Sequence, residues 1–89
     1  MLLTIDVGNT NTVLGTFLGE DLVHSWRVKT DPRSTADELW LQMRALVEGI
    51  DVTGLSICST VPATLREMRT MISTYFSVLL LPLRCHFWH

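Results

Sequence analysis

The first thirty residues carry the hydrophobic and polar pattern of three β-strands. Residues 2–7 form a nearly continuous apolar run, which is typical of a buried central strand. Residues 12–18 are rich in valine, leucine, threonine and phenylalanine and predict a second strand. After a turn at residues 18–21, residues 22–29 alternate between two faces, which predicts a half-exposed third strand near a sheet edge. We expect these strands to form an antiparallel meander. The residues predicted to share one face of the third strand are Leu22, His24, Trp26 and Val28.

Two later stretches have the periodicity of helices. Thr35 and Glu38 match the S/T-x-x-E pattern of a capping box, which begins a helix predicted over residues 35–48. Pro62 suits the first turn of a second helix, predicted over residues 62–76. The apolar positions that mark the buried faces of the two helices are Ala36, Leu39, Trp40, Met43, Leu46, Val47 and Ile50, then Leu65, Met68, Ile72, Tyr75 and Phe76.

The remaining apolar runs complete the fold prediction. Residues 54–59 predict a fourth strand, and residues 77–83 predict a fifth. The element order is then β-β-β-α-β-α-β, which implies an α/β mixed sheet with helices packed on it. This is also the order of the ribonuclease-H-like half-domain, although a fold order by itself does not reveal function.

Composition sets limits on the class of protein. A chain of 89 residues makes one small domain, and its hydrophobic content of 47% favours apolar faces meant for a partner or for further chain. The net charge of −2 provides no basic footprint for nucleic acid. The two cysteines form no CxxC pair, as expected of a reduced, cytoplasmic protein. No positive segment precedes the first apolar run and no run approaches ~20 apolar residues, so we expect neither a signal peptide nor a membrane span.

The strongest candidate for chemistry is the stretch DVGNTNT between the first two predicted strands. Gly8 permits backbone angles and close approaches that other residues do not, so amides near it can form an anion-binding nest. Asp6 supplies a hard oxygen ligand for Mg²⁺. On spacing alone, a polar β-turn with an incidental acid is an equally good interpretation. Side-chain donors to a phosphate tail would come from Asn9, Thr10, Asn11 and Thr12.

Four segments, in the right order, resemble one enzyme family. They are MLLTIDVGNTNTVLG at the start, WRVKTDPRSTADEL over residues 26–39, SICSTVP over residues 56–62 and LREMRTMISTYF over residues 65–76. Together they resemble the type III pantothenate kinases, whose phosphate motif has the form D-x-G-N-T. These kinases belong to the acetate kinase, sugar kinase, Hsp70 and actin superfamily. The family is also similar to the Bvg accessory factor proteins, some of which are named as regulators.

The resemblance implies a specific activity. Such an enzyme transfers the γ-phosphoryl group of ATP to pantothenate, giving 4'-phosphopantothenate in the first step of coenzyme A biosynthesis. It is a cytoplasmic homodimer that uses Mg²⁺ and a monovalent cation, potassium or ammonium. By motif match, Asp6 positions the metal. The residues implied to bind the ATP phosphates are Asp6, Val7, Gly8, Asn9, Thr10, Asn11, Thr12 and Val13.

After Phe76 we find no further likeness. The family's pantothenate loop, P-G-x-K-T-G, its G-x-D-R segment with the catalytic base, and its adenosine domain have no counterpart here. We therefore expect an N-terminal half-domain over residues 1–76, an aberrant tail over residues 77–89 and no second domain. The tail resembles the product of a shifted reading frame, and a divergent C-terminal strand is the alternative. No acid can be assigned as the base, so the chain alone is expected to be inactive.

Two other classes of function compete with the kinase. A ribonuclease-H-like nuclease needs two or more carboxylates on paired metals, and only Asp6 sits at a suitable strand end, so this class ranks low. A non-catalytic remnant or a regulatory protein of the Bvg accessory factor type is the serious alternative. It would lack a base, a pantothenate loop and an adenosine site.

A few further residues invite a functional interpretation. Ser59 and Thr60 end a predicted strand at the expected cleft, where they could line a substrate site or cap the following helix. His24 is better explained by packing than by ligation. The sequence C-H-x-x-H, from Cys85 to His89, is too crowded for an ordinary zinc site and is best explained as accidental.

Overall fold

A computed structural model describes residues 1–76 and 79–80 of the chain. Its element order confirms the predicted β-β-β-α-β-α-β arrangement. The helices begin and end within about one residue of their predicted bounds. The elements are β1 (Leu2–Val7), β2 (Asn11–Leu18), β3 (Asp21–Lys29), α1 (Ala36–Val47), β4 (Gly54–Ser59), α2 (Pro62–Tyr75) and β5 (Leu79–Leu80).

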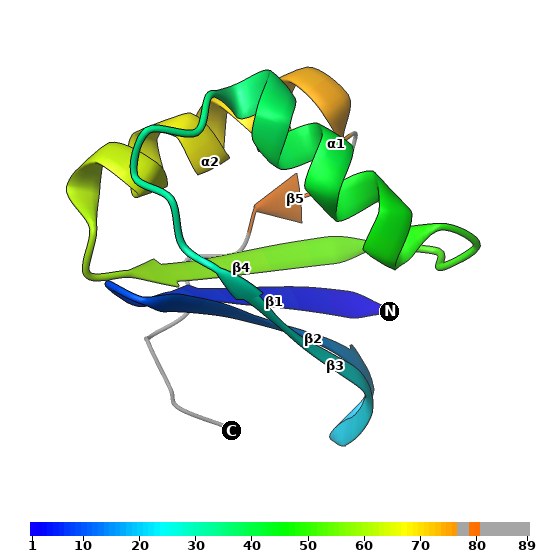
Figure 1. Cartoon of the computed structure of the whole chain (residues 1–89). Helices are drawn as coiled ribbons and strands as arrows, with labels where there is room; N and C mark the ends of the chain where they lie inside the picture. The colour runs from blue at the N-terminus through cyan, green and yellow to red at the C-terminus, as the bar shows by residue number, and fades with distance from the viewer. Residues whose placement is uncertain (77–78, 81–89) are drawn as a thin grey trace.

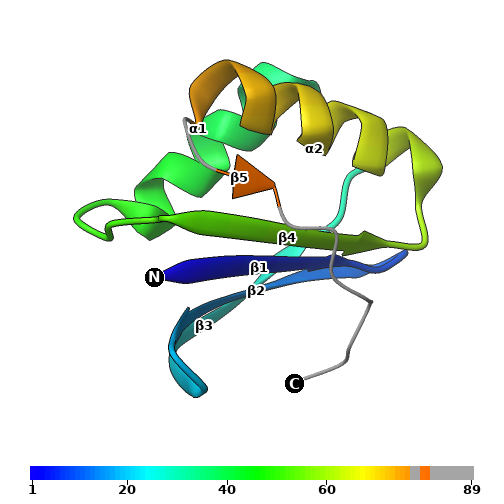
Figure 2. The same cartoon turned by 180° about the vertical axis from the view of Figure 1, so that it is seen from behind.

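The strands form one mixed sheet in the order β3-β2-β1-β4-β5. β1 pairs antiparallel with β2 and parallel with β4, so it lies in the interior of the sheet as its apolar run predicts. β2 also pairs antiparallel with β3, which confirms the meander and places β3 at an edge of the described sheet. Both helices cover the same face of this sheet (Figures 1 and 2).

One detail of β3 differs from the sequence prediction. The register between β2 and β3 shifts between Thr16 and Phe17, so that Thr16 pairs with His24 but Phe17 pairs with Leu22. Because neighbouring strand residues point to opposite faces, this bulge removes Leu22 from the face that it was predicted to share with His24. Of the predicted fifth strand over residues 77–83, Leu79–Leu80 pairs parallel with β4, and the rest lies outside the described residues.

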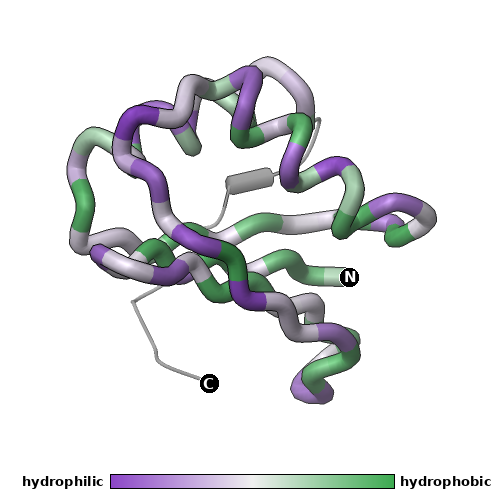
Figure 3. Tube along the Cα trace, in the orientation of Figure 1, coloured by the Kyte–Doolittle hydropathy of each residue, from purple (hydrophilic) through white to green (hydrophobic). Residues whose placement is uncertain are grey.

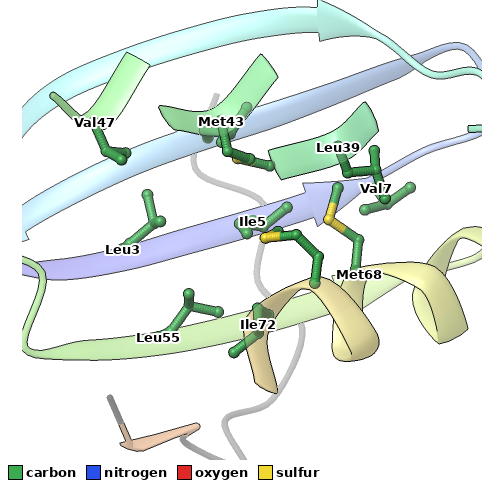
Figure 4. Packing of buried hydrophobic residues seen from close by; sticks show 11 residues of the cluster. Leu3, Ile5, Val7, Leu39, Met43, Val47, Leu55, Met68 and Ile72 are labelled. Atoms are coloured by element: carbon green, nitrogen blue, oxygen red, sulfur yellow. The ribbon is translucent and has the colours of Figure 1, made fainter. Parts of the chain in front are cut away.

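The core lies between the sheet and the two helices. Leu3, Ile5 and Val7 on β1 are fully buried, and they meet residues of both helices and of β4 (Figure 4). Figure 3 shows apolar positions along β1 and hydrophilic positions in the connection from β3 to α1. The other members of the buried cluster are Leu14, Leu39, Met43, Val47, Leu55, Met68, Met71 and Ile72.

Local side-chain chemistry determines where α1 begins. The Thr35 hydroxyl accepts a hydrogen bond from the Glu38 N–H at 3.3 Å, and the Glu38 carboxylate accepts one from the Thr35 N–H at 3.0 Å. This reciprocal pair confirms the predicted capping box. In the same first turn of α1, the Asp37 carboxylate accepts a hydrogen bond from the hydroxyl of Tyr75, the last residue of α2, which raises the pKa of Tyr75. The Tyr75 ring stacks on Trp40 at 4.8 Å, so α2 is held against α1.

Among the described residues, neither helix is both long and apolar enough to cross a membrane.

Ile5→Val tests whether β1 carries the core. Ile5 is 0% exposed, so removing one methylene group should lower the free energy of unfolding by about 0.5–1.5 kcal/mol. Leu41→Ala is the control, because Leu41 on α1 is 60% exposed and should change stability by less than about 0.5 kcal/mol. Urea unfolding followed by circular dichroism measures both. Equal losses in the two variants would contradict a core centred on β1.

Candidate functional site

A cavity of about 290 Å³ lies where β1 and β4 end and β2 begins. Because β1 and β4 are parallel, their carboxyl ends meet at the same edge of the sheet, which is where ligands bind in open α/β sheets. The lining residues come from β1, β2, β3 and the segment after β4. Those that the structure describes are Asp6, Val7, Gly8, Asn11, Val13, Arg27 and Thr60.

The turn between β1 and β2 is held closed by its own backbone. The Gly8 N–H donates to the Asn11 carbonyl at 2.9 Å. A Cβ atom at residue 8 would lie 3.0 Å from that carbonyl oxygen, a tight contact that would require the turn to shift by a few tenths of an ångström. The backbone of Gly8 does not have a positive φ, so glycine is needed here for close approach and not for an unusual backbone conformation.

This closure changes the anion-binding nest that the sequence predicts. The Gly8 N–H is already used within the turn, so it does not point outward as a donor. In the described part of the chain, the N–H groups of Asn9 and Thr10 have no acceptor, and both residues are exposed. The backbone donors that remain for an anion are therefore at the tip of the turn.

The other predicted phosphate-binding residues fall into two groups, those that line the cavity and those that do not. Val7 and Val13 line the cavity with Asp6, Gly8 and Asn11, whereas Asn9 and Thr10 lie outside its lining. Thr12 is 3% exposed, and its hydroxyl lies 2.8 Å from that of Thr30. The Thr12 side chain therefore fastens the end of β3 to the hairpin. The Thr30 N–H also donates to the Thr10 carbonyl at 2.9 Å, which holds the turn from a second side.

Asp6 is placed by the alternation of β1. Its neighbours Ile5 and Val7 face the helices, so the Asp6 carboxylate points to the opposite face of the sheet. There it pairs across the strands with Val13 and Cys58, and it is only 7% exposed. In the described part of the chain, no group of three or more His, Cys, Asp or Glu residues could hold a metal by itself. One carboxylate at a cavity fits Mg²⁺ that takes its other ligands from substrate phosphates and water.

Sequence reasoning missed Arg27 as a cavity residue. It lies on β3 opposite Val13, which in turn lies opposite Asp6, so the three residues form one row across the sheet. Alternation along residues 22–29 separates Arg27 from the apolar face, but only the strand register shows that it shares a row with Asp6. The available signal was the charge of Arg27 on the face opposite Trp26 and Val28.

The structure separates the two polar residues at the end of β4. The Thr60 N–H donates to the Val7 carbonyl at 3.1 Å, which extends the pairing of β1 with β4 and brings Thr60 to the cavity. The Ser59 hydroxyl instead contacts the backbone N–H and carbonyl of Val61, at 2.9 and 3.0 Å. Val61 is the N-cap of α2 and has no side-chain cap, so Ser59 organises the approach to the helix without capping it.

The remaining candidates lie away from this cavity. His24 stacks on Trp26 at 5.4 Å, and its Nδ1 lies 2.9 Å from the Thr16 hydroxyl, which confirms a packing role. The C-H-x-x-H sequence lies outside the described residues. A second hollow, of about 400 Å³, lies beside Trp40 and Tyr75 and includes none of the predicted site residues. Asp6 is the one acid among the described lining residues, which disfavours a two-metal nuclease.

The fold and the site together define a class of protein. A mixed sheet of this order, with an acid at the end of β1 beside a glycine turn, is the ribonuclease-H-like half-domain of the actin, Hsp70 and sugar kinase superfamily. The family model for type III pantothenate kinase matches residues 2–86, which continues past Phe76. The chain belongs to the type III pantothenate kinase family.

Curated relatives carry the same family name. The chain is 62% identical over 78 residues to a type III pantothenate kinase of Salinispora arenicola, covering 85% of this chain and 31% of that protein. It is 63% identical over 76 residues to one of Parafrankia sp., covering 85% and 30%. It is 49% identical over 87 residues to a type III pantothenate kinase of Streptomyces coelicolor, covering 85% of this chain and 32% of that protein. The chain therefore spans about a third of the length of these relatives.

Gly8→Ala tests the closure of the turn. The added Cβ would press on the Asn11 carbonyl oxygen, so we expect the Gly8–Asn11 hydrogen bond to lengthen and the free energy of unfolding to fall by roughly 1 kcal/mol. Hydrogen exchange at the residue 8 amide should speed up more than global destabilisation explains. Gly19→Ala is the control, because Gly19 has a φ of 64° and open space, so that its substitution strains a different turn. Unchanged protection at residue 8 in Gly8→Ala would contradict this account.

Proposed function

We propose that this chain supplies the phosphate-binding half-domain, residues 1–76, of an ATP-dependent pantothenate kinase. The observation that carries the proposal is the position of Asp6, a nearly buried acid at the end of β1 that lines one cavity with Gly8 and Asn11. Family membership adds the substrate class, because the relatives are named for pantothenate. The proposed reaction forms 4'-phosphopantothenate and so begins coenzyme A biosynthesis.

The proposed reaction is a phosphoryl transfer. The bond between the γ-phosphorus of ATP and the β–γ bridging oxygen breaks, and a bond to the hydroxyl oxygen of pantothenate forms. ADP leaves with the electron pair of the broken bond, and the hydroxyl proton passes to a base. Such transfers depend mainly on positioning and on stabilising phosphate charge. The turn from Gly8 to Thr12 would position the phosphates through its exposed amides.

Asp6 would hold Mg²⁺ together with phosphate oxygens, and bound Mg²⁺ neutralises charge on the phosphate tail. A monovalent cation, potassium or ammonium, and a homodimer belong to the same proposal through the family resemblance. ATP as the phosphoryl donor favours a cytoplasmic setting.

In this proposal, the residues of the chain's half-domain supply neither the catalytic base nor the remaining substrate contacts. Asp6 is committed to the metal, and Glu38 and Glu67 lie on the helices, outside the lining of the cavity. The relatives are about three times as long as this chain. We therefore assign the base, the adenosine site and the pantothenate loop to the part of the family that this chain does not span.

Asp6→Asn should weaken binding of Mg²⁺-ATP by about tenfold or more, since it removes the charged metal ligand. Glu67→Gln is the matched control, because it removes one acid from α2, away from the cavity, and should leave binding within about twofold. Titration of each variant with Mg²⁺-ATP, followed by amide chemical shifts, measures both. Equal effects of the two substitutions would remove Asp6 from the site.

Activity should require the remainder of a family member. The 89-residue chain with ATP, Mg²⁺, potassium and labelled pantothenate should give no more than trace turnover, because the lack of a base alone typically costs ~10²–10⁴-fold. A chimera tests the positive claim: residues 1–76 replace the matching segment of the Salinispora arenicola relative. This chimera should phosphorylate pantothenate, and Asp6→Ala should abolish that turnover.

Two outcomes would overturn the proposed activity. Turnover by the isolated chain, lost in Asp6→Ala, would show that its own residues complete the site. A folded chimera that binds Mg²⁺-ATP without phosphorylating pantothenate would favour the non-catalytic, regulatory alternative.

A further inference from the structure

Among the described residues, one cationic side chain lines the cavity at the end of β1. Arg27 is the one lysine or arginine among the described lining residues, and it faces the same space as Asp6, Gly8 and Asn11. It is exposed, and within the described residues it makes no ion pair and no side-chain hydrogen bond. The ion pair that the described residues do contain joins Arg33 and Asp31, outside this cavity. Among the described residues, Arg27 therefore has no structural partner that accounts for its charge.

The strand register places Arg27 across the cavity from the acid. Arg27 and Asp6 are separated by Val13, one strand from each. Neighbouring strands lie about 4.7–4.9 Å apart, so the two Cα atoms are roughly 10 Å from each other. Val13 is apolar and offers nothing polar to a ligand between them. A charged ligand in this space would have Asp6 with its metal on one side and a guanidinium on the other.

The other lining groups indicate which ligand this is. Asn11 and Thr60 offer an amide and a hydroxyl to the cavity, and the backbone N–H groups of Asn9 and Thr10 lie at the tip of the adjoining turn, so the nearby donors suit an anion. An arginine fork matches the oxygens of a phosphate and binds them in pairs. A chain of phosphates can reach from the turn to β3, whereas a single small anion would contact one side only.

We propose that Arg27 binds the polyphosphate chain of the nucleotide, as the cation that faces the turn and Asp6 across the cavity. This inference rests on the proposed function, because it assigns a phosphate-binding residue to that same site. It makes β3 a third contributor to the phosphate site, beside the β1–β2 turn and the segment after β4.

Titration of the 89-residue chain with inorganic phosphates tests the role of Arg27. The probes are tripolyphosphate, pyrophosphate and orthophosphate, each with Mg²⁺, followed by amide chemical shifts. Arg27→Gln should weaken tripolyphosphate binding about tenfold, with a smaller loss for pyrophosphate and the smallest for orthophosphate. Arg27→Lys should recover part of this loss, because it restores the charge without the fork.

The control is Arg69→Gln, since Arg69 is exposed on α2 and lies outside the cavity lining. It removes the same charge and should leave tripolyphosphate binding within about twofold. A purely structural role for Arg27 would weaken all three probes by one factor and would lower the thermal midpoint. The graded loss with phosphate number, at an unchanged midpoint, is the result that supports direct contact.

The outcomes separate this inference from the proposed function. If Arg27→Gln binds tripolyphosphate as the parent chain does while Asp6→Asn does not, Arg27 is excluded and the phosphate site stands. If the parent chain fails to bind tripolyphosphate at all, the proposed phosphate site itself is wrong. If Arg27→Gln leaves tripolyphosphate binding unchanged and alters only the amide chemical shifts caused by pantothenate, Arg27 recognises a carboxylate. The polyphosphate assignment is then overturned.

Discussion

The alternation of side chains along β1 is the constraint on which this structure depends. Leu3, Ile5 and Val7 are fully buried against the helices, so the same strand register must direct Asp6 to the opposite face. A slip of one residue would bring the carboxylate into the apolar core and would move Ile5 away from the helices, to the face that Asp6 now occupies. The burial that stabilises the domain and the orientation of its acid are therefore consequences of one pairing.

Hydrogen bonding on both sides of β1 then brings the rest of the site together. Antiparallel pairing with β2 returns the chain through a tight turn, which the Gly8–Asn11 hydrogen bond closes. Parallel pairing with β4 places Thr60 beside the end of β1, where its N–H donates to the Val7 carbonyl. The cavity thus lies where three strands end or begin, with Arg27 added from β3, and each of its described lining residues lies on a strand or directly after one.

This arrangement suits a kinase in which phosphate binding and proton transfer are carried out by different parts of the protein. In the proposed function the hairpin and its one acid hold a metal and phosphates, and an acid that binds the metal cannot also accept the proton of an attacking hydroxyl. The described lining offers no second carboxylate. The proposed function therefore places phosphate binding in this half-domain and proton transfer in the portion of the relatives that the chain does not span.

The sequence by itself determined the element order, the capping box of Thr35 and Glu38, the central position of β1 and the pairing of an acid with a glycine turn. These features are local, because periodicity, caps and turns involve residues only a few positions apart. Tertiary structure alone decided that Arg27 shares a row with Asp6, that the Thr12 hydroxyl is used by Thr30, and that a bulge displaces Leu22. It also decided that the Gly8 N–H donates to the Asn11 carbonyl within the turn. The outcomes for Arg27, Thr12 and Leu22 depend on strand register, which long-range pairing sets and which a single stretch of sequence does not contain. The Gly8–Asn11 hydrogen bond spans only three residues, but its direction depends on the backbone geometry of the turn, which residue types alone do not specify.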